Sequence, residues 1–157
     1  MSGKIGIAAA AVLVGILSCA PASAGEAVLF VKAGTYDDVR FDLTNAIVER
    51  GLKIDYNGKT ADMLARTGAD VGSTKPIYKA AEFFSFCSAK LSRTMMEADP
   101  ANLGACPYIV FIYETVAKPG EVVVGYRKPT PRGNAASKAA LAEVGQLLEG
   151  IAKDATK

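Results

Sequence analysis

The chain has 157 residues, with 18 basic and 16 acidic side chains, three cysteines, and neither histidine nor tryptophan. The missing histidine excludes a Ser-His-Asp triad, a Cys-His pair and any histidine-ligated zinc, haem or blue-copper site. Half of the residues are apolar and 22% are charged, as in a single globular domain. A net charge of +2 is too small to indicate a nucleic-acid or anionic-membrane partner.

Residues 1–24 have the pattern of a secretory signal peptide. Lys4 precedes an apolar run from Ile5 to Leu17, which is shorter than the roughly 20 residues that span a bilayer. Pro21 then breaks the helix, and the small residues Ala22-Ser23-Ala24 follow it where a signal peptidase cuts. We therefore expect cleavage between Ala24 and Gly25.

A weaker alternative lies in the same segment. Ile16-Leu17-Ser18-Cys19 is similar to a bacterial lipobox, in which Cys19 would carry the lipid, but Leu17 is unusual at its position. Either signal predicts a periplasmic or secreted protein with two cysteines left. The ordinary signal predicts no transmembrane anchor in the mature chain.

In the first half of the mature chain, two strands and two helices are expected. The apolar residues 27–31 indicate a buried strand, and Thr35 can cap a helix that ends near Gly51. Residues 52–57 alternate between apolar and polar, which predicts a half-buried strand ending at an Asn57-Gly58 turn. Thr60 then begins a short helix that closes around Gly68.

The second half predicts three further strands and two further helices. After a helical or irregular stretch at 76–81, we expect a strand at 82–88, a helix at 89–98 and strands at 107–116 and 122–126. A long helix begins at Ala135 and presents one apolar face. The order β-α-β-α-β-α-β-β-α predicts an α+β fold, in which one mixed, mostly antiparallel sheet carries helices on one side. Residues 25–130 form the core domain, and residues 131–157 form a C-terminal helix packed on it.

Several short segments resemble a secreted member of domain-of-unknown-function family 302. They are Arg66-Thr-Gly-Ala-Asp-Val-Gly72, Phe86-Cys-Ser-Ala89, Ala98-Asp-Pro100, Cys106-Pro-Tyr108 and Tyr126-Arg-Lys-Pro129. The similarity spans about residues 27–130 and leaves the C-terminal helix outside. It implies a small α+β domain that commonly forms homodimers. It implies no activity and no functional residues, because the family has no agreed function.

Cys87 and Cys106 admit three interpretations. An even count in an oxidising compartment favours a disulfide, but the two residues lie at the same end of the sheet only if their strands are adjacent and antiparallel. They can also be buried thiols among the neighbouring aromatic residues. The third interpretation is a redox pair, or a soft Cu(I) site with Met95 and Met96, although no Cys-X-X-Cys motif is present to lower a thiol pKa.

Other candidate sites are weaker. Arg66, Arg93, Tyr108 and Arg127 form a candidate anion or ligand pocket, since guanidinium groups bind oxyanions in a fork, although a solvated or salt-bridged arginine is the ordinary case. The carboxylate pairs Asp37-Asp38 and Glu97-Asp99 are explained by helix ends.

The favoured function is therefore a non-enzymatic exported binding or accessory domain without a cofactor. We expect a homodimer, formed through the sheet or a helix face, that takes a small ligand or an exported protein partner. The alternative is a thiol-redox, Cu(I) or reactive-sulfur protein that uses Cys87 and Cys106. The sequence does not identify the ligand.

Overall fold

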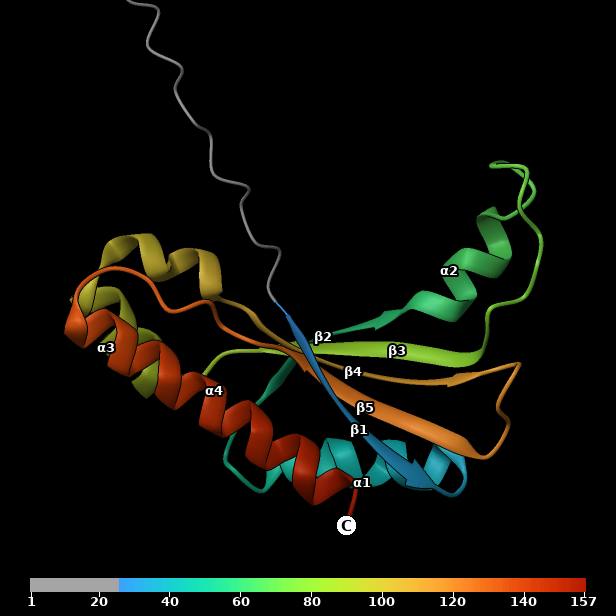
Figure 1. Ribbon diagram of the computed structural model, residues 1–157, viewed down its shortest axis with the longest axis horizontal. Helices are drawn as coiled ribbons and strands as arrows, with labels where there is room; N and C mark the ends of the chain where they lie inside the picture. The colour runs from blue at the N-terminus through green and yellow to red at the C-terminus, as the bar shows by residue number, and fades with distance from the viewer. Residues whose placement is uncertain (1–25) are drawn as a thin grey trace, which may run out of the picture.

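The computed structural model describes residues 26–157, so the expected signal peptide, Cys19 and the Ala24–Gly25 cleavage site lie outside the described residues (Figure 1). The predicted element order is confirmed, with one added 3-10 helix, η1. The elements are β1 (Ala27–Ala33), α1 (Tyr36–Val48), β2 (Ile54–Lys59), α2 (Thr60–Thr67), β3 (Tyr78–Phe86), α3 (Ala89–Ala98), η1 (Pro100–Ala105), β4 (Tyr108–Thr115), β5 (Glu121–Arg127) and α4 (Ala135–Ala155).

The five strands form one sheet in the order β1-β5-β4-β3-β2. All four pairings are antiparallel, so the expected α+β class is confirmed and the sheet contains no parallel pair among these strands. Because β1 and β2 occupy opposite edges, the connection through α1 must cross the sheet. This crossing places α1 beneath the central strands, where it packs beside α4.

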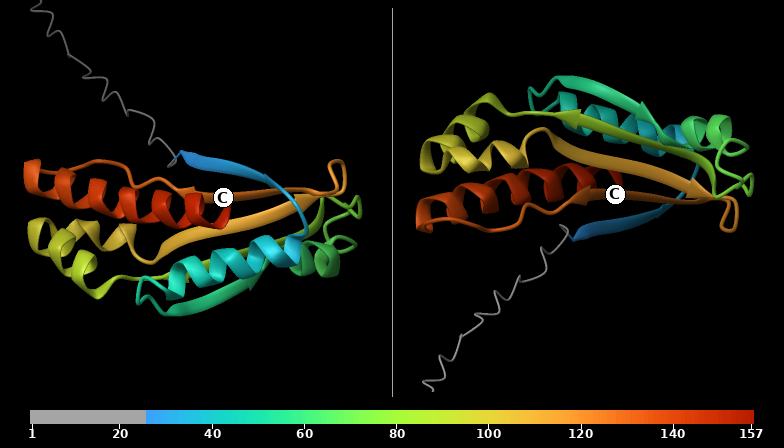
Figure 2. Two further views of the ribbon diagram at one scale, coloured as in Figure 1. Left: turned by 90° about the horizontal axis from the view of Figure 1, so that it is seen from below. Right: turned by 90° about the horizontal axis from the view of Figure 1, so that it is seen from above.

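The sheet separates two unlike faces. Helices α1, α3 and α4 lie on one side of it, whereas α2 rises from the other side at one end (Figures 1 and 2). We call the side away from α1 and α4 the open face. The helix-covered face carries the core, and the open face is left to the strands and α2.

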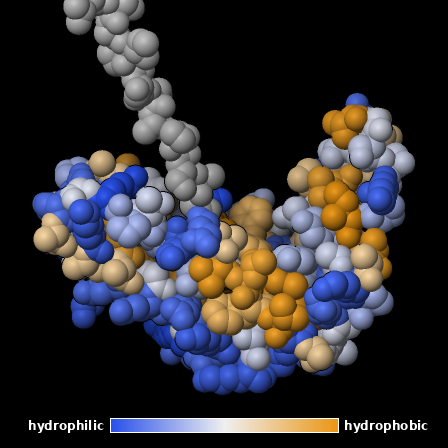
Figure 3. All heavy atoms as spheres, in the orientation of Figure 1, coloured by the Kyte–Doolittle hydropathy of each residue, from blue (hydrophilic) through white to orange (hydrophobic). Residues whose placement is uncertain are grey.

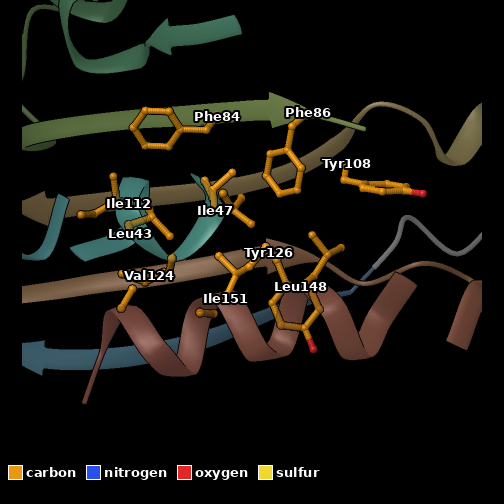
Figure 4. Packing of buried hydrophobic residues seen from close by; sticks show 14 of the residues in the cluster. Leu43, Ile47, Phe84, Phe86, Tyr108, Ile112, Val124, Tyr126, Leu148 and Ile151 are labelled. Carbon is orange, nitrogen blue, oxygen red and sulfur yellow. The ribbon is translucent and has the colours of Figure 1, made fainter. Parts of the chain in front are cut away.

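The core is built from alternate residues of the central strands. Along β4 the side chains alternate strictly, so that Tyr108, Val110 and Ile112 are 0–2% exposed and point toward the helices. They meet Leu43 and Ile47 of α1 and the apolar stripe of α4, whose Leu148 and Ile151 are 0–1% exposed (Figure 4). Burial of this shared apolar surface is the main force that holds the helices on the sheet.

Local capping explains where α1, α3 and α4 begin. The Thr35 hydroxyl accepts a hydrogen bond from the backbone N–H of Asp38 at 3.2 Å, and Asn134 caps α4 through the N–H of Ser137 at 2.8 Å. Ser88 does the same for α3. These side chains satisfy donors that the first helical turn leaves free.

The predicted Asn57-Gly58 turn is wrong. β2 continues through Gly58 to Lys59 and passes directly into α2. Gly58 serves close packing: a Cβ on it would lie 2.0 Å from the Phe83 ring. A bulge between Ile54 and Tyr56 also breaks the expected alternation, so that Tyr56 is 60% exposed.

The predicted irregular stretch at 76–81 is also partly wrong. β3 begins at Tyr78, four residues before the expected start, because Tyr78 and Ala80–Glu82 pair with the end of β4. The small residues Ala80 and Ala81 have weak strand propensity, and this pairing overrides it.

Candidate functional site

The central sheet splits open at one end, between β4 and β5. Their ladder stops at the Val110–Tyr126 pair, although β4 begins at Tyr108 and β5 ends at Arg127. Continuing the register would set Pro107 opposite Pro129, and neither proline has an N–H to donate. The two strands diverge there (Figure 2, right). A cavity of about 210 Å³ lies at this point, with Leu148 of α4 among its lining residues. We call this cavity the notch.

The notch is basic. Arg127, Lys128 and Arg132 line it together with Tyr108, and no carboxylate is among its lining residues. Within residues 26–157, Arg127 makes no ion pair closer than 4 Å, and Lys128 has only a distant contact of 3.9 Å with Glu26. Positive charge is therefore concentrated in a small hollow without an internal counter-ion.

Arg132 is held in place by a buried network. Its Nε donates to Oδ1 of Asn102 at 3.0 Å, and Nη2 donates to the carbonyl of Ala101 at 2.8 Å. Asn102 is 0% exposed and donates in turn to the carbonyl of Met95 and the hydroxyl of Ser137. This network joins α3, η1 and α4 at the wall of the notch.

Only two of the four residues of the predicted anion or ligand pocket lie together in the structure. Tyr108 and Arg127 both line the notch, but Arg66 and Arg93 do not. Arg66 is exposed on α2, and Arg93 is exposed on α3, where it pairs with Glu97 at 3.0 Å. Lys128 and Arg132 take their places, and the two prolines that open the sheet were the sequence signal for them.

Tyr108 lines the notch and is also part of the buried core. Its ring is 2% exposed, and its hydroxyl lies 3.2 Å from that of Ser92. Burial raises the pKa of the Tyr108 hydroxyl, which outweighs the opposing effect of the Ser92 hydrogen bond. Tyr108 is therefore a neutral phenol at physiological pH.

Cys87 and Cys106 form a disulfide. β3 and β4 are adjacent and antiparallel, so the two residues lie at the same end of the sheet, with a Cα–Cα distance of 6.4 Å. The bond encloses α3 and η1 within a sequence separation of 19 residues. Strand direction, which the sequence left open, decides between the three interpretations of this pair.

The soft-metal interpretation finds no assembled ligand set. Bonded sulfurs are not thiolate ligands, and Met95 is 0% exposed within the core. Met96 packs against the same core. Among residues 26–157, no group of three or more His, Cys, Asp or Glu side chains is placed to hold a metal ion.

The most buried carboxylates are engaged by cations. Glu82 accepts from Arg40 at 3.0 Å, from Asn57 at 2.9 Å and from Lys59 at 2.8 Å. Burial raises the pKa of Glu82, but these hydrogen bonds outweigh it and hold the pKa below its usual value. Glu114 likewise has a lowered pKa, because the Gly120 N–H and Lys79 donate to it.

Within the described range, no helix is long and apolar enough to cross a membrane.

The comparisons with known proteins identify the family. The model of "Domain of unknown function DUF302" matches residues 30–155. The match includes α4, so the expectation that the C-terminal helix lies outside the shared domain is wrong. A solved structure described as an uncharacterized conserved protein DUF302 from Bacillus stearothermophilus has the same fold, with a TM-score of 0.68, 12% sequence identity, and coverage of 82% of this chain and 97% of that one. No curated protein matches. The chain therefore belongs to the DUF302 family.

Proposed function

We propose that this chain is an exported, non-enzymatic domain that binds a small anion in the notch. One observation carries the proposal: Arg127, Lys128 and Arg132 converge on a cavity that no carboxylate lines. Two guanidinium groups can each bind an oxyanion through two parallel N–H donors. Arg132 is pre-positioned by Asn102, which reduces the entropy lost on binding.

Anion titration tests this proposal. Acetate, inorganic phosphate and sulfate are each titrated by calorimetry into the unmodified protein and into the Arg127→Gln variant. A charge-assisted hydrogen bond contributes about 1.5–3 kcal/mol, so we expect the variant to bind roughly 10- to 100-fold more weakly. The matched control is Arg93→Gln, because the Arg93 side chain is 79% exposed and lies outside the notch. Equal binding by both variants would contradict the proposal.

The state of the carboxylates supports a non-enzymatic role. A general acid or base works best with a pKa near the working pH. Glu82 and Glu114 instead have lowered pKa values, because neighbouring donors stabilise their charged forms. Both side chains act as anchors between elements.

Export is the second part of the proposal, and it rests on the pattern of residues 1–24. Intact mass spectrometry of the protein from a periplasmic fraction tests it. We expect a chain that begins at Gly25 and lacks the mass of two hydrogens, as the disulfide requires. A chain that begins with an acylated Cys19 would contradict cleavage after Ala24.

The third part is a homodimer joined at the free edge of β1. Among residues 26–157, no strand pairs with the outer edge of β1, and Leu29 and Val31 of β1 are 50% and 57% exposed. Figure 3 shows an apolar patch on the face where Figure 1 places β1. An uncovered edge with apolar side chains is a template for pairing with another strand.

A further inference from the structure

A second cavity lies beside the notch, on the open face of the sheet. This cavity has a volume of about 280 Å³ and shares Ile109 and Arg127 with the notch. Its lining is mostly aromatic and aliphatic, with Tyr78, Phe83, Phe111 and Tyr113 as the aromatic members, and it also includes Thr60 and Glu82. We call it the channel. Arg127 stands at the junction between the basic notch and the apolar channel.

Two glycines create the channel. Phe83 and Phe111 are direct cross-strand partners on β3 and β4, but their rings turn away from each other. The Phe83 ring lies over Gly58 of β2, and the Phe111 ring lies over Gly125 of β5, where added Cβ atoms would come within 2.0 Å and 2.5 Å of the rings. The space between the rings stays open, and its floor is the paired backbone of β3 and β4.

The length of the channel can be estimated along β4. Tyr113 lies four residues beyond Ile109 along β4, so the channel extends about 13 Å from the junction. Tyr113 meets Tyr78 edge-on at the far end, with 5.5 Å between the ring centroids. Ala81, which pairs with Tyr113, leaves room for a chain in this last section.

We propose that the ligand is a straight-chain aliphatic carboxylate of the fatty-acid class. Its carboxylate would pair with Arg127 and Lys128 in the notch, and its acyl chain would lie between the Phe83 and Phe111 rings. This inference rests on the proposed anion site and adds an apolar tail to its ligand. Charge complementarity at one end and a narrow apolar channel at the other distinguish such a ligand from a free oxyanion.

A chain-length series on the unmodified protein tests the inference. Acetate, butanoate, hexanoate, octanoate and dodecanoate are titrated below their micellar concentrations into protein expressed from its full-length sequence. Each buried methylene should raise the affinity about fourfold until the channel is filled. Dodecyl trimethylammonium, which carries the same chain with the opposite charge, should bind at least tenfold more weakly than dodecanoate.

A variant locates the acyl chain. Ala81→Leu fills the far section of the channel, so it should reduce dodecanoate affinity at least tenfold while leaving acetate and butanoate unchanged. The matched control is Ala136→Leu, on the exposed surface of α4, which should change neither.

The outcomes separate the two proposals. Anion binding that does not depend on chain length would overturn the fatty-acid assignment and leave the anion site standing. Failure of every carboxylate to bind, while phosphate or sulfate still binds, would overturn the fatty-acid assignment alone, and failure of every anion would overturn both. Equal binding of dodecanoate and the ammonium probe would show general adhesion to apolar surface, and would also overturn the assignment.

Discussion

Glu82 of β3 accepts from three donors that belong to two elements. Arg40 of α1, and Asn57 and Lys59 of β2, all donate to it, and its side chain is 10% exposed. The buried hydroxyl of Tyr36 has no hydrogen-bond partner within residues 26–157, and burial followed by the charge of Glu82 raises its pKa. This cluster fixes the start of α1 against the edge of the sheet.

Replacing Glu82 tests this role. Glu82→Gln should lower the free energy of unfolding at pH 7 by about 1–3 kcal/mol, because it removes charge-assisted hydrogen bonds. The pKa of Glu82 is lowered in the folded protein, so the stabilisation is present above the unfolded value of about 4.3 and is lost as the pH falls through the folded value. Urea unfolding at pH 7 and pH 3 measures the difference.

Exposed Glu143 on α4 provides the control for this experiment. Glu143→Gln should change the free energy of unfolding by less than about 0.5 kcal/mol at either pH. A Glu82→Gln deficit that is as large at pH 3 as at pH 7 would show that shape, and not charge, accounts for the loss.

At the scale of elements, α2 differs from the other α-helices of the described chain because it buries no residue. Leu64 of α2 is 37% exposed and Met63 is 42% exposed, whereas Leu43 of α1 is 0% exposed. α2 contacts the sheet mainly through β3. Its position follows from β2, which runs directly into it, and not from packing of an apolar face.

A pair of leucine substitutions tests this contrast. Leu43→Ala should lower the free energy of unfolding by about 2–5 kcal/mol, because it leaves a cavity in the core. Leu64→Ala should lower it by less than about 1 kcal/mol. Chemical denaturation of the two variants gives both values, and a large loss in Leu64→Ala would place α2 within the cooperative core.

The disulfide joins the two ends of the segment that contains α3 and η1. It closes a loop of 19 residues, which in the chain-entropy treatment stabilises the fold by about 3 kcal/mol. The double variant Cys87→Ala/Cys106→Ala should therefore unfold at lower urea concentration than the oxidised protein. Thiol titration of the native protein provides the check, because two reactive thiols would contradict the bond.

At the scale of the whole molecule, the free edge of β1 predicts self-association. Val31→Lys places a charge beside this edge, so light scattering should show the proposed dimer converted to a monomer. Val48→Lys is the matched control for Val31→Lys, because Val48 lies on α1 and is 58% exposed, about as much as Val31. If Val48→Lys dissociates the protein and Val31→Lys does not, the interface lies at the helices and not at β1. A monomeric wild-type protein would contradict an interface at either place.

Local signals in the sequence predicted much of this fold. The helices at 89–98 and 135–155 begin where their predicted starts lie, because capping and apolar periodicity are encoded within a few residues. The Asn57-Gly58 prediction failed for the opposite reason. A glycine needed for close approach of a distant ring has no local signature, and Phe83 lies 25 positions away.

The candidate site was predicted only in part. Arg127 and Tyr108 were named with Arg66 and Arg93, because residue type alone does not distinguish four candidates. The split between β4 and β5 brings Arg127, Lys128 and Arg132 together, and this split depends on two prolines meeting across the sheet. The channel depends on the Phe83 and Phe111 rings, which lie over Gly58 and Gly125 of the neighbouring strands.

The absence of histidine excluded several enzyme classes from the sequence by itself, and local periodicity determined the order of strands and helices. Only the tertiary structure decided which segments meet. The direction of β4 relative to β3 brought Cys87 to Cys106, and the end of the β4–β5 ladder opened the basic notch. Both depend on how whole strands pair in the sheet, and the free energy of that pairing is a property of the whole core and not of any short segment.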